Sequence, residues 1–185
     1  MMRWDRLFAD LTAELEASEQ ADLESEIADR TRSERARLRF VDRLRGSPDL
    51  PLAVRVLGGT TVSGTLRGIG PDWCLLRGTA GDHVVRLGAV LDVVGLAPRS
   101  VEPGSEGEVA ARFSLAAVVR RLGRDRTIVT LLQVDGGLVT GTVDLAGADV
   151  LEITDRRSDE PGWSRGSGVT VRRTVPFDAV AVIRH

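Results

Sequence analysis

Few residues in this chain belong to the types that usually carry out chemistry. Among 185 residues there are two histidines, His83 and His185, and one cysteine, Cys74. A catalytic site needs a nucleophile beside a base, paired carboxylates or a group of metal ligands, and neither histidine lies at a ligand spacing. Cys74 follows Trp73 in an apolar stretch, where cysteine acts as a small hydrophobic residue, and an isolated His83 is expected at a strand edge in solvent. The sequence therefore predicts a non-enzymatic protein without a cofactor or metal site.

Glycine-rich stretches offer no phosphate-binding loop either. Gly58-Gly59 and Gly136-Gly137 are followed by neither a Lys-Ser/Thr pair nor a helix, which a phosphate loop requires, so they are expected to form hairpin turns. Asp72 and Asp149 each stand just before a predicted strand, where Asp is typical of turns. These positions are interpreted as structural.

Arginine remains as the residue type with chemical potential, because all 25 basic residues are Arg. Arginines beside an exposed aromatic residue bind single-stranded nucleic acid by charge and stacking. One group ends the predicted helix over 109–122, and another flanks a polar insertion over 154–168 that contains Trp163. The members of the two groups are Arg120, Arg121, Arg124, Arg126, Arg156, Arg157, Arg165, Arg172 and Arg173. The net charge of −2 gives no overall attraction for polyanions. The absence of Lys, Asn and Tyr also fits a GC-rich genome.

The segment over 4–44 is predicted to be helical, because it has no Gly or Pro and is rich in helix-forming residues. It is interpreted as one bent helix or two helices with a boundary near residue 30. Its acids precede its arginines, an order that suits the helix dipole and antiparallel pairing with a second copy. An apolar stripe at helical spacing is a candidate for oligomerisation: Trp4, Leu7, Phe8, Leu11 and Leu15. Docking of this stripe within the chain and self-association both remain open.

The rest of the chain repeats itself. Gly64-Thr65 matches Gly141-Thr142, and the stretch over 85–90 matches the stretch over 175–180. Self-similarity at a fixed period indicates a duplicated module.

Each repeat is predicted to contain a helix followed by five short strands. In the first repeat, predicted strands cover 52–57, 61–69, 73–77, 83–87 and 90–96. So many short strands and turns indicate a small closed barrel, because an open sheet would leave its edges unprotected. The fold class is therefore mainly β with α. The expected domains are an N-terminal helical segment over 1–45, a first barrel over 46–96, a linker over 97–108, and a helix ended by Gly123 plus a second barrel over 109–185.

Several residues resemble the signatures of the Sm-like fold, a family of SH3-type small barrels. Val62, Gly64, Leu66 and Gly68 with a bulky apolar Trp73 resemble its first signature. The stretch over 85–90 resembles its second. The chain as a whole is also similar to an actinobacterial protein family with an N-terminal helix.

The resemblance implies an RNA-binding site built from an Asp, an Asn and an Arg-Gly pair. In the first repeat the Asp and Asn positions hold Gly70 and Cys74, and Arg86 remains with Leu87 in place of the glycine. In the second repeat none of these positions holds the family's residue; they are occupied by Gly147, Leu151, Pro176 and Phe177. The resemblance therefore adds Arg86 to the nucleic-acid candidates.

The function expected from the sequence is protein–protein interaction or regulatory scaffolding, with self-association through the N-terminal helix or the barrel edges. The alternative is binding of RNA or single-stranded DNA through the arginine groups and Trp163. A single cysteine, no signal peptide and no apolar run of membrane-spanning length predict a cytoplasmic protein without a membrane partner.

Overall fold

The computed structural model describes residues 14, 20, 23–33, 36–98, 113–155 and 171–185. The chain divides into two compact units, over 1–39 and over 40–185. In the first unit, residues 23–33 form helix that runs through the expected boundary at residue 30, and Leu23 and Ile27 are exposed. The predicted oligomerisation stripe, from Trp4 to Leu15, lies outside the described residues.

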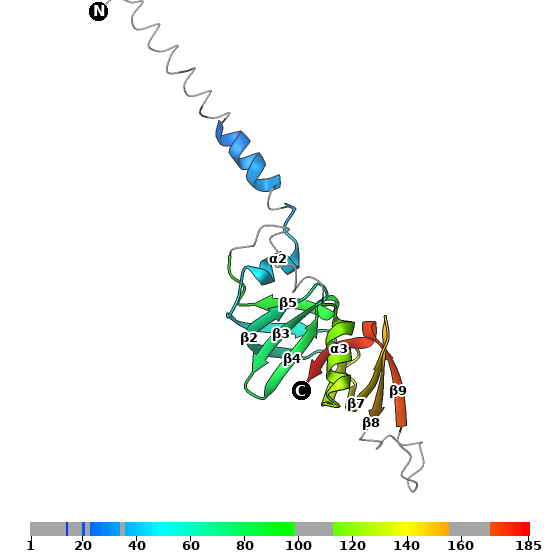
Figure 1. The fold of residues 1–185 in the computed structure, drawn as a ribbon. Helices are drawn as coiled ribbons and strands as arrows, with labels where there is room; N and C mark the ends of the chain where they lie inside the picture. The colour runs from blue at the N-terminus through cyan, green and yellow to red at the C-terminus, as the bar shows by residue number, and fades with distance from the viewer. Residues whose placement is uncertain (1–13, 15–19, 21–22, 34–35, 99–112, 156–170) are drawn as a thin grey trace, which may run out of the picture. The chain divides into compact units, whose positions relative to one another are not determined.

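The second unit is a single open sheet of ten antiparallel strands (Figure 1), in the order β5-β1-β2-β3-β4-β10-β6-β7-β8-β9. The strands are β1 Pro51–Val56, β2 Thr61–Ile69, β3 Trp73–Gly78, β4 Gly81–Arg86, β5 Val90–Val94, β6 Ile128–Gln133, β7 Leu138–Ala146, β8 Val150–Asp155, β9 Val171–Pro176 and β10 Val180–Arg184. The helices of this unit are α2 Phe40–Arg45 and α3 Leu115–Arg124, and 3-10 turns Leu87–Ala89 and Phe177–Ala179 precede β5 and β10. Predicted strand ends in the first repeat differ from these by two residues at most.

The prediction of two closed barrels is wrong, because the ten strands form one sheet that does not close. The strands of each repeat follow the same order, β5-β1-β2-β3-β4 and β10-β6-β7-β8-β9, and β4 pairs with β10. Closure was expected because a short open sheet has unprotected edges. The edge of β4 is instead covered by a strand of the other repeat. The predicted domains over 46–96 and 109–185 both fall within the second unit.

The duplication is confirmed by matching backbone contacts. In the first repeat, Gly70 N donates a hydrogen bond of 2.8 Å to Trp73 O, and in the second, Gly147 N donates one of 2.8 Å to Val150 O. The ladders of β2 with β3 and of β7 with β8 are also interrupted by register shifts at equivalent places. The glycine pairs at 58–59 and 136–137 form hairpin turns as predicted, joining β1 to β2 and β6 to β7.

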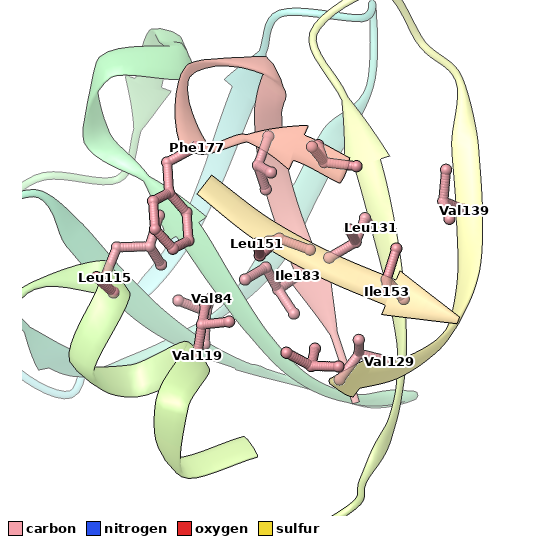
Figure 2. Close-up of a cluster of buried hydrophobic side chains, with 14 residues drawn as sticks. Val84, Leu115, Val119, Val129, Leu131, Val139, Leu151, Ile153, Phe177 and Ile183 are labelled. Atoms are coloured by element: carbon pink, nitrogen blue, oxygen red, sulfur yellow. The ribbon is translucent and has the colours of Figure 1, made fainter. Parts of the chain in front are cut away.

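Two hydrophobic clusters make up the core, one for each repeat, and β10 supplies side chains to both. The first cluster lies between the strands of the first repeat and includes Ala181 and Val182 of β10. The second, shown in Figure 2, contains Val180 and Ile183 of β10 together with Val84 from β4. All four of these β10 side chains are buried. The two repeats therefore share their core through this strand.

Helix α3 packs on β7 and continues past the residue that was expected to end it. Gly123 lies inside the helix, which runs to Arg124. A Cβ on Gly123 would lie 3.3 Å from Val143 O of β7, so the glycine allows helix and strand to approach closely. The expected insertion also starts later than predicted, because Thr154 and Asp155 belong to β8.

Candidate functional site

The joint between the repeats is a continuous antiparallel ladder formed by β4 and β10. Ile183 lies opposite Val84, and at the end of the ladder Asp82 and His185 exchange two backbone hydrogen bonds of 3.2 Å each. Since β6 pairs with the other side of β10, neither side of β10 is free. Here the chain itself uses strand pairing to join two similar units.

Arg86 closes one end of this joint. Its Nε donates to Val180 O over 2.8 Å, while its two terminal nitrogens donate to Asp178 Oδ1 over 3.0 Å and to Asp178 O over 2.8 Å. The Arg86 side chain is only 15% exposed. A guanidinium with several fixed acceptors is well suited to holding two segments together. The residue that the sequence analysis assigned to nucleic acid thus makes contacts within the protein.

The first repeat also positions the helix that covers the second repeat. Asp72 Oδ1 accepts a hydrogen bond of 2.8 Å from Leu115 N, at the first turn of α3, and Trp73 Nε1 donates one of 2.6 Å to Phe113 O. The residue before the helix, Ser114, makes no capping bond with its side chain. Asp72 therefore takes over a role that a local capping residue usually has. Its position in the sequence predicts only a turn residue.

His83 lies in this joint rather than at a solvent-facing strand edge as predicted, because β10 covers β4. Its Nδ1 is buried and has no hydrogen-bond partner among the described residues. Burial lowers the pKa of His83 below its ordinary value of 6.5, and the nearby charge of Arg184 lowers it further, while Asp82 acts in the opposite direction. The fold therefore favours the neutral imidazole.

Acidification is expected to weaken the fold through His83. A histidine whose pKa is lower in the folded state contributes stability above its unfolded pKa, and this contribution is lost as the pH falls below about 6.5. The pKa of Asp82 is lowered by its hydrogen bond with Arg77, so its contribution is lost at more acidic pH and does not overlap. Urea unfolding between pH 7.5 and 5, as a rough working range, should show a steeper loss of stability for the wild type than for His83→Gln. Equal slopes would contradict this assignment.

Cys74 behaves as the sequence predicted, as a buried apolar residue of β3. Its side chain is 1% exposed, and burial raises the pKa of its thiol to about 12. The thiol is therefore protonated at neutral pH and does not act as a nucleophile there. Within the described segments, no group of His, Cys, Asp and Glu side chains has the arrangement of a metal site.

The arginines at the end of α3 are brought together as predicted. All four are exposed: Arg120, Arg121, Arg124 and Arg126. Two of them line an open hollow of about 310 Å³ between α3 and β7, whose lining residues are Arg120, Gly123, Arg124, Val143, Asp144, Leu145 and Ala146. The Arg120 guanidinium also donates a hydrogen bond of 3.3 Å to Gly147 O. This end of the helix combines positive charge with a partly apolar concavity.

The other predicted arginine group has two members on β9, both in ion pairs, and its other members lie outside the described residues. Arg172 lies 3.6 Å from Glu152 and 3.8 Å from Asp144, and Arg173 Nε donates a hydrogen bond of 2.8 Å to the buried carboxylate of Asp155. These ion pairs connect β9 to β8 and to β7 beyond it. The remaining candidates lie outside the described residues: Arg156, Arg157, Trp163 and Arg165.

The two outer strands of the sheet differ in character. On β5, Leu91 is 48% exposed and Val94 is 69% exposed. On β9, the exposed residues are polar or proline: Arg172, Thr174 and Pro176. An apolar outer strand with a free backbone edge is a typical site for pairing with another chain, whereas charge and proline at an edge discourage it. β5 is therefore the better candidate interaction surface, which was not predicted from the sequence.

Comparison of the chain with protein-family models, with curated proteins and with solved structures finds no match. Among the described residues no helix is long and apolar enough to cross a membrane.

Proposed function

We propose that this protein is a non-enzymatic interaction protein that binds a protein partner by strand pairing at the free edge of β5. The observation that carries the proposal is the contrast between β5 and β10. These two strands are repeat counterparts, and β10 is buried between β4 and β6, whereas among the described residues β5 has a neighbouring strand on one side only. Strand addition to an exposed sheet edge is a common mode of protein recognition. The sequence resemblance to the Sm-like family is compatible with this role, since small β modules use their edges in this way.

A photo-reactive amino acid at position 91 of the full chain tests this proposal in living cells. The expected result is a cross-link to one recurrent peptide segment, identified by mass spectrometry. The matched control carries the same group at position 174, on the polar outer strand β9, and is expected to give no such product. Equal labelling from both positions, or no peptide adduct from position 91, would reject β5 as the interaction edge.

The runner-up is binding of RNA or single-stranded DNA at the end of α3, and one observation favours it. Four exposed arginines gather there beside an open hollow, which is the combination of charge and concavity that single strands use. Fluorescence anisotropy of a labelled single-stranded RNA, at low and high salt, is the direct test. Binding through this site should fall steeply with salt and weaken in the double variant Arg120→Ala with Arg121→Ala. An Arg67→Ala variant is the matched control, because Arg67 is an exposed arginine of β2 that pairs with Asp49 and does not line the hollow.

A further inference from the structure

Strand β10 shows how β5 would be packed if a further strand paired with its outer edge, because the two strands are repeat counterparts. The inference drawn from this comparison rests on the function proposed above. Ala181 of β10 is 0% exposed, whereas its counterpart Leu91 of β5 is 48% exposed. Both strands have a partner on one side from their own repeat, β6 for β10 and β1 for β5. The difference is the second neighbour, which β10 has in β4. The exposed apolar side chains of β5 are those that an additional strand would cover.

The opposite edge of the sheet is a poor candidate for that additional strand. Strand β9 is the repeat counterpart of β4, but Thr174 replaces Val84 and Pro176 replaces Arg86. Because Phe177 N donates inward to Asp149 O and ladder groups alternate in direction, the backbone of Pro176 faces the free edge, where it offers no N–H. The chain has therefore lost on β9 the features that make the joint on β4.

The face of β8 beside β9 also differs from the corresponding face of β3 beside β4. In the first repeat, Trp73 and Leu75 of β3 pack with the second cluster across the joint. Their counterparts on β8 are Val150 and Glu152, and Glu152 forms an ion pair with Arg172. A charged side chain on this face opposes the burial that a second joint of the same kind needs. Head-to-tail pairing of β9 with β5 is thus disfavoured at both the backbone and the side chains.

Strand β5 is complementary to itself. An antiparallel pairing centred on Asp92 places Leu91 opposite Val93 and Val90 opposite Val94. All pairs except that of Asp92 with itself are therefore apolar. The same pairing places Asp92 opposite Asp92 of the second copy. Each carboxylate accepts a hydrogen bond of 2.6 Å from Arg55 Nε of its own chain, which reduces the repulsion between them. A two-fold axis makes such a pairing antiparallel, as is the rest of the sheet.

We propose that the protein forms a two-fold dimer in which β5 pairs antiparallel with β5 of a second copy. The pairing occupies the apolar edge of both copies and leaves only the two β9 edges at the ends of the continuous sheet. Those ends carry Pro176 and the ion-paired Arg172, which are features that prevent further strand addition. The assembly therefore closes at two copies.

Sedimentation velocity of the full chain over a range of concentrations tests this proposal. The wild type is expected to sediment as a dimer, and Leu91→Asp is expected to raise its dissociation constant by about tenfold or more, since a charge would be placed in the interface. Val94→Asp, at a more exposed position, gives an independent second variant. Thr174→Asp on β9 is the matched control and should leave the dimer unchanged. Circular dichroism confirms that each variant is folded.

Three results would overturn the dimer. One is a wild type that remains monomeric at its highest soluble concentration. Another is a dimer that is lost in Ile27→Asp, in the exposed helix of the first unit, but kept in Leu91→Asp. A third is a dimer that is weakened by Thr174→Asp, which would indicate head-to-tail pairing through β9. Cross-linking from position 91 to a different protein, with a monomeric wild type, would reject the dimer and leave the proposed interaction edge intact.

Discussion

Val182→Asp is expected to lower the free energy of unfolding by about 3–5 kcal/mol, the typical cost of an uncompensated buried charge. Val182 is 0% exposed and belongs to the first cluster, although it comes from the second repeat. Its strand β10 lies between β4 and β6, so the carboxylate would be placed among apolar side chains with no route to solvent. Because domains are stable by only about 5–15 kcal/mol, this single change would remove a large part of the protein's stability.

Urea unfolding followed by circular dichroism measures this effect. Thr174→Asp introduces the same charge on an outer strand at an exposed position, and it should alter stability by about 0.5 kcal/mol or less. Val182→Ala separates lost packing from buried charge and should have an intermediate effect. If Val182→Asp were as stable as Thr174→Asp, β10 would not be buried between the repeats.

The second large effect is expected at the glycines that the two repeats share. A Cβ on Gly64 would lie 2.7 Å from Arg77 O, and a Cβ on Gly141 would overlap Thr154 O. In both cases the obstacle is backbone of the neighbouring strand, which cannot move aside as a side chain would. Gly141→Ala is expected to destabilise the protein by about 3 kcal/mol, at the upper end of the cost of overpacking, with Gly64→Ala somewhat less harmful.

Gly68→Ala provides the matched control for these substitutions. It also lies on β2, but the nearest atom to its Cβ would be Leu75 Cβ at 3.6 Å, which is an ordinary contact. Thermal unfolding of the three alanine variants should therefore give the order Gly68→Ala, Gly64→Ala and Gly141→Ala, from most to least stable. A Gly141→Ala variant that melts with the wild type would show that β7 and β8 are not held at this close approach.

The sequence predicted those parts of the fold that depend on local pattern. Alternation of apolar and polar residues identified the strands, and the glycine pairs identified the hairpins, because both signals arise from neighbouring residues. The error about closed barrels has a different origin. Which strand lies beside β4 depends on a ladder formed with β10, about a hundred residues further along the chain, and periodicity carries no such information.

One signal for the joint was nevertheless present in the sequence. The strand over 90–94 contains Asp92, whereas its counterpart over 180–184 has no charge before Arg184. A strand that is apolar on both faces is typical of a central position, and one with a charge is typical of an edge. Comparing the repeats position by position would therefore have placed β10 inside the sheet.

The side-chain contacts between the two repeats were harder to predict. Arg86 and Asp178 are 92 residues apart, and Asp72 caps a helix 43 residues further along the chain. Neither pair has a spacing that marks it in the sequence. The arginines of α3 were grouped correctly because one short helix carries most of them.

The central place of β10 also affects how the protein emerges from the ribosome. Residues that meet in the joint, such as Arg86 and Val180, are separated by 94 positions. At translation rates of about 5–20 residues per second, the completed first repeat waits roughly 5–20 s for the strand that covers β4. During that time the nascent chain exposes an unpaired apolar strand edge next to the ribosome. A chaperone that shields such edges during synthesis would therefore act on the first repeat, before the second has been made.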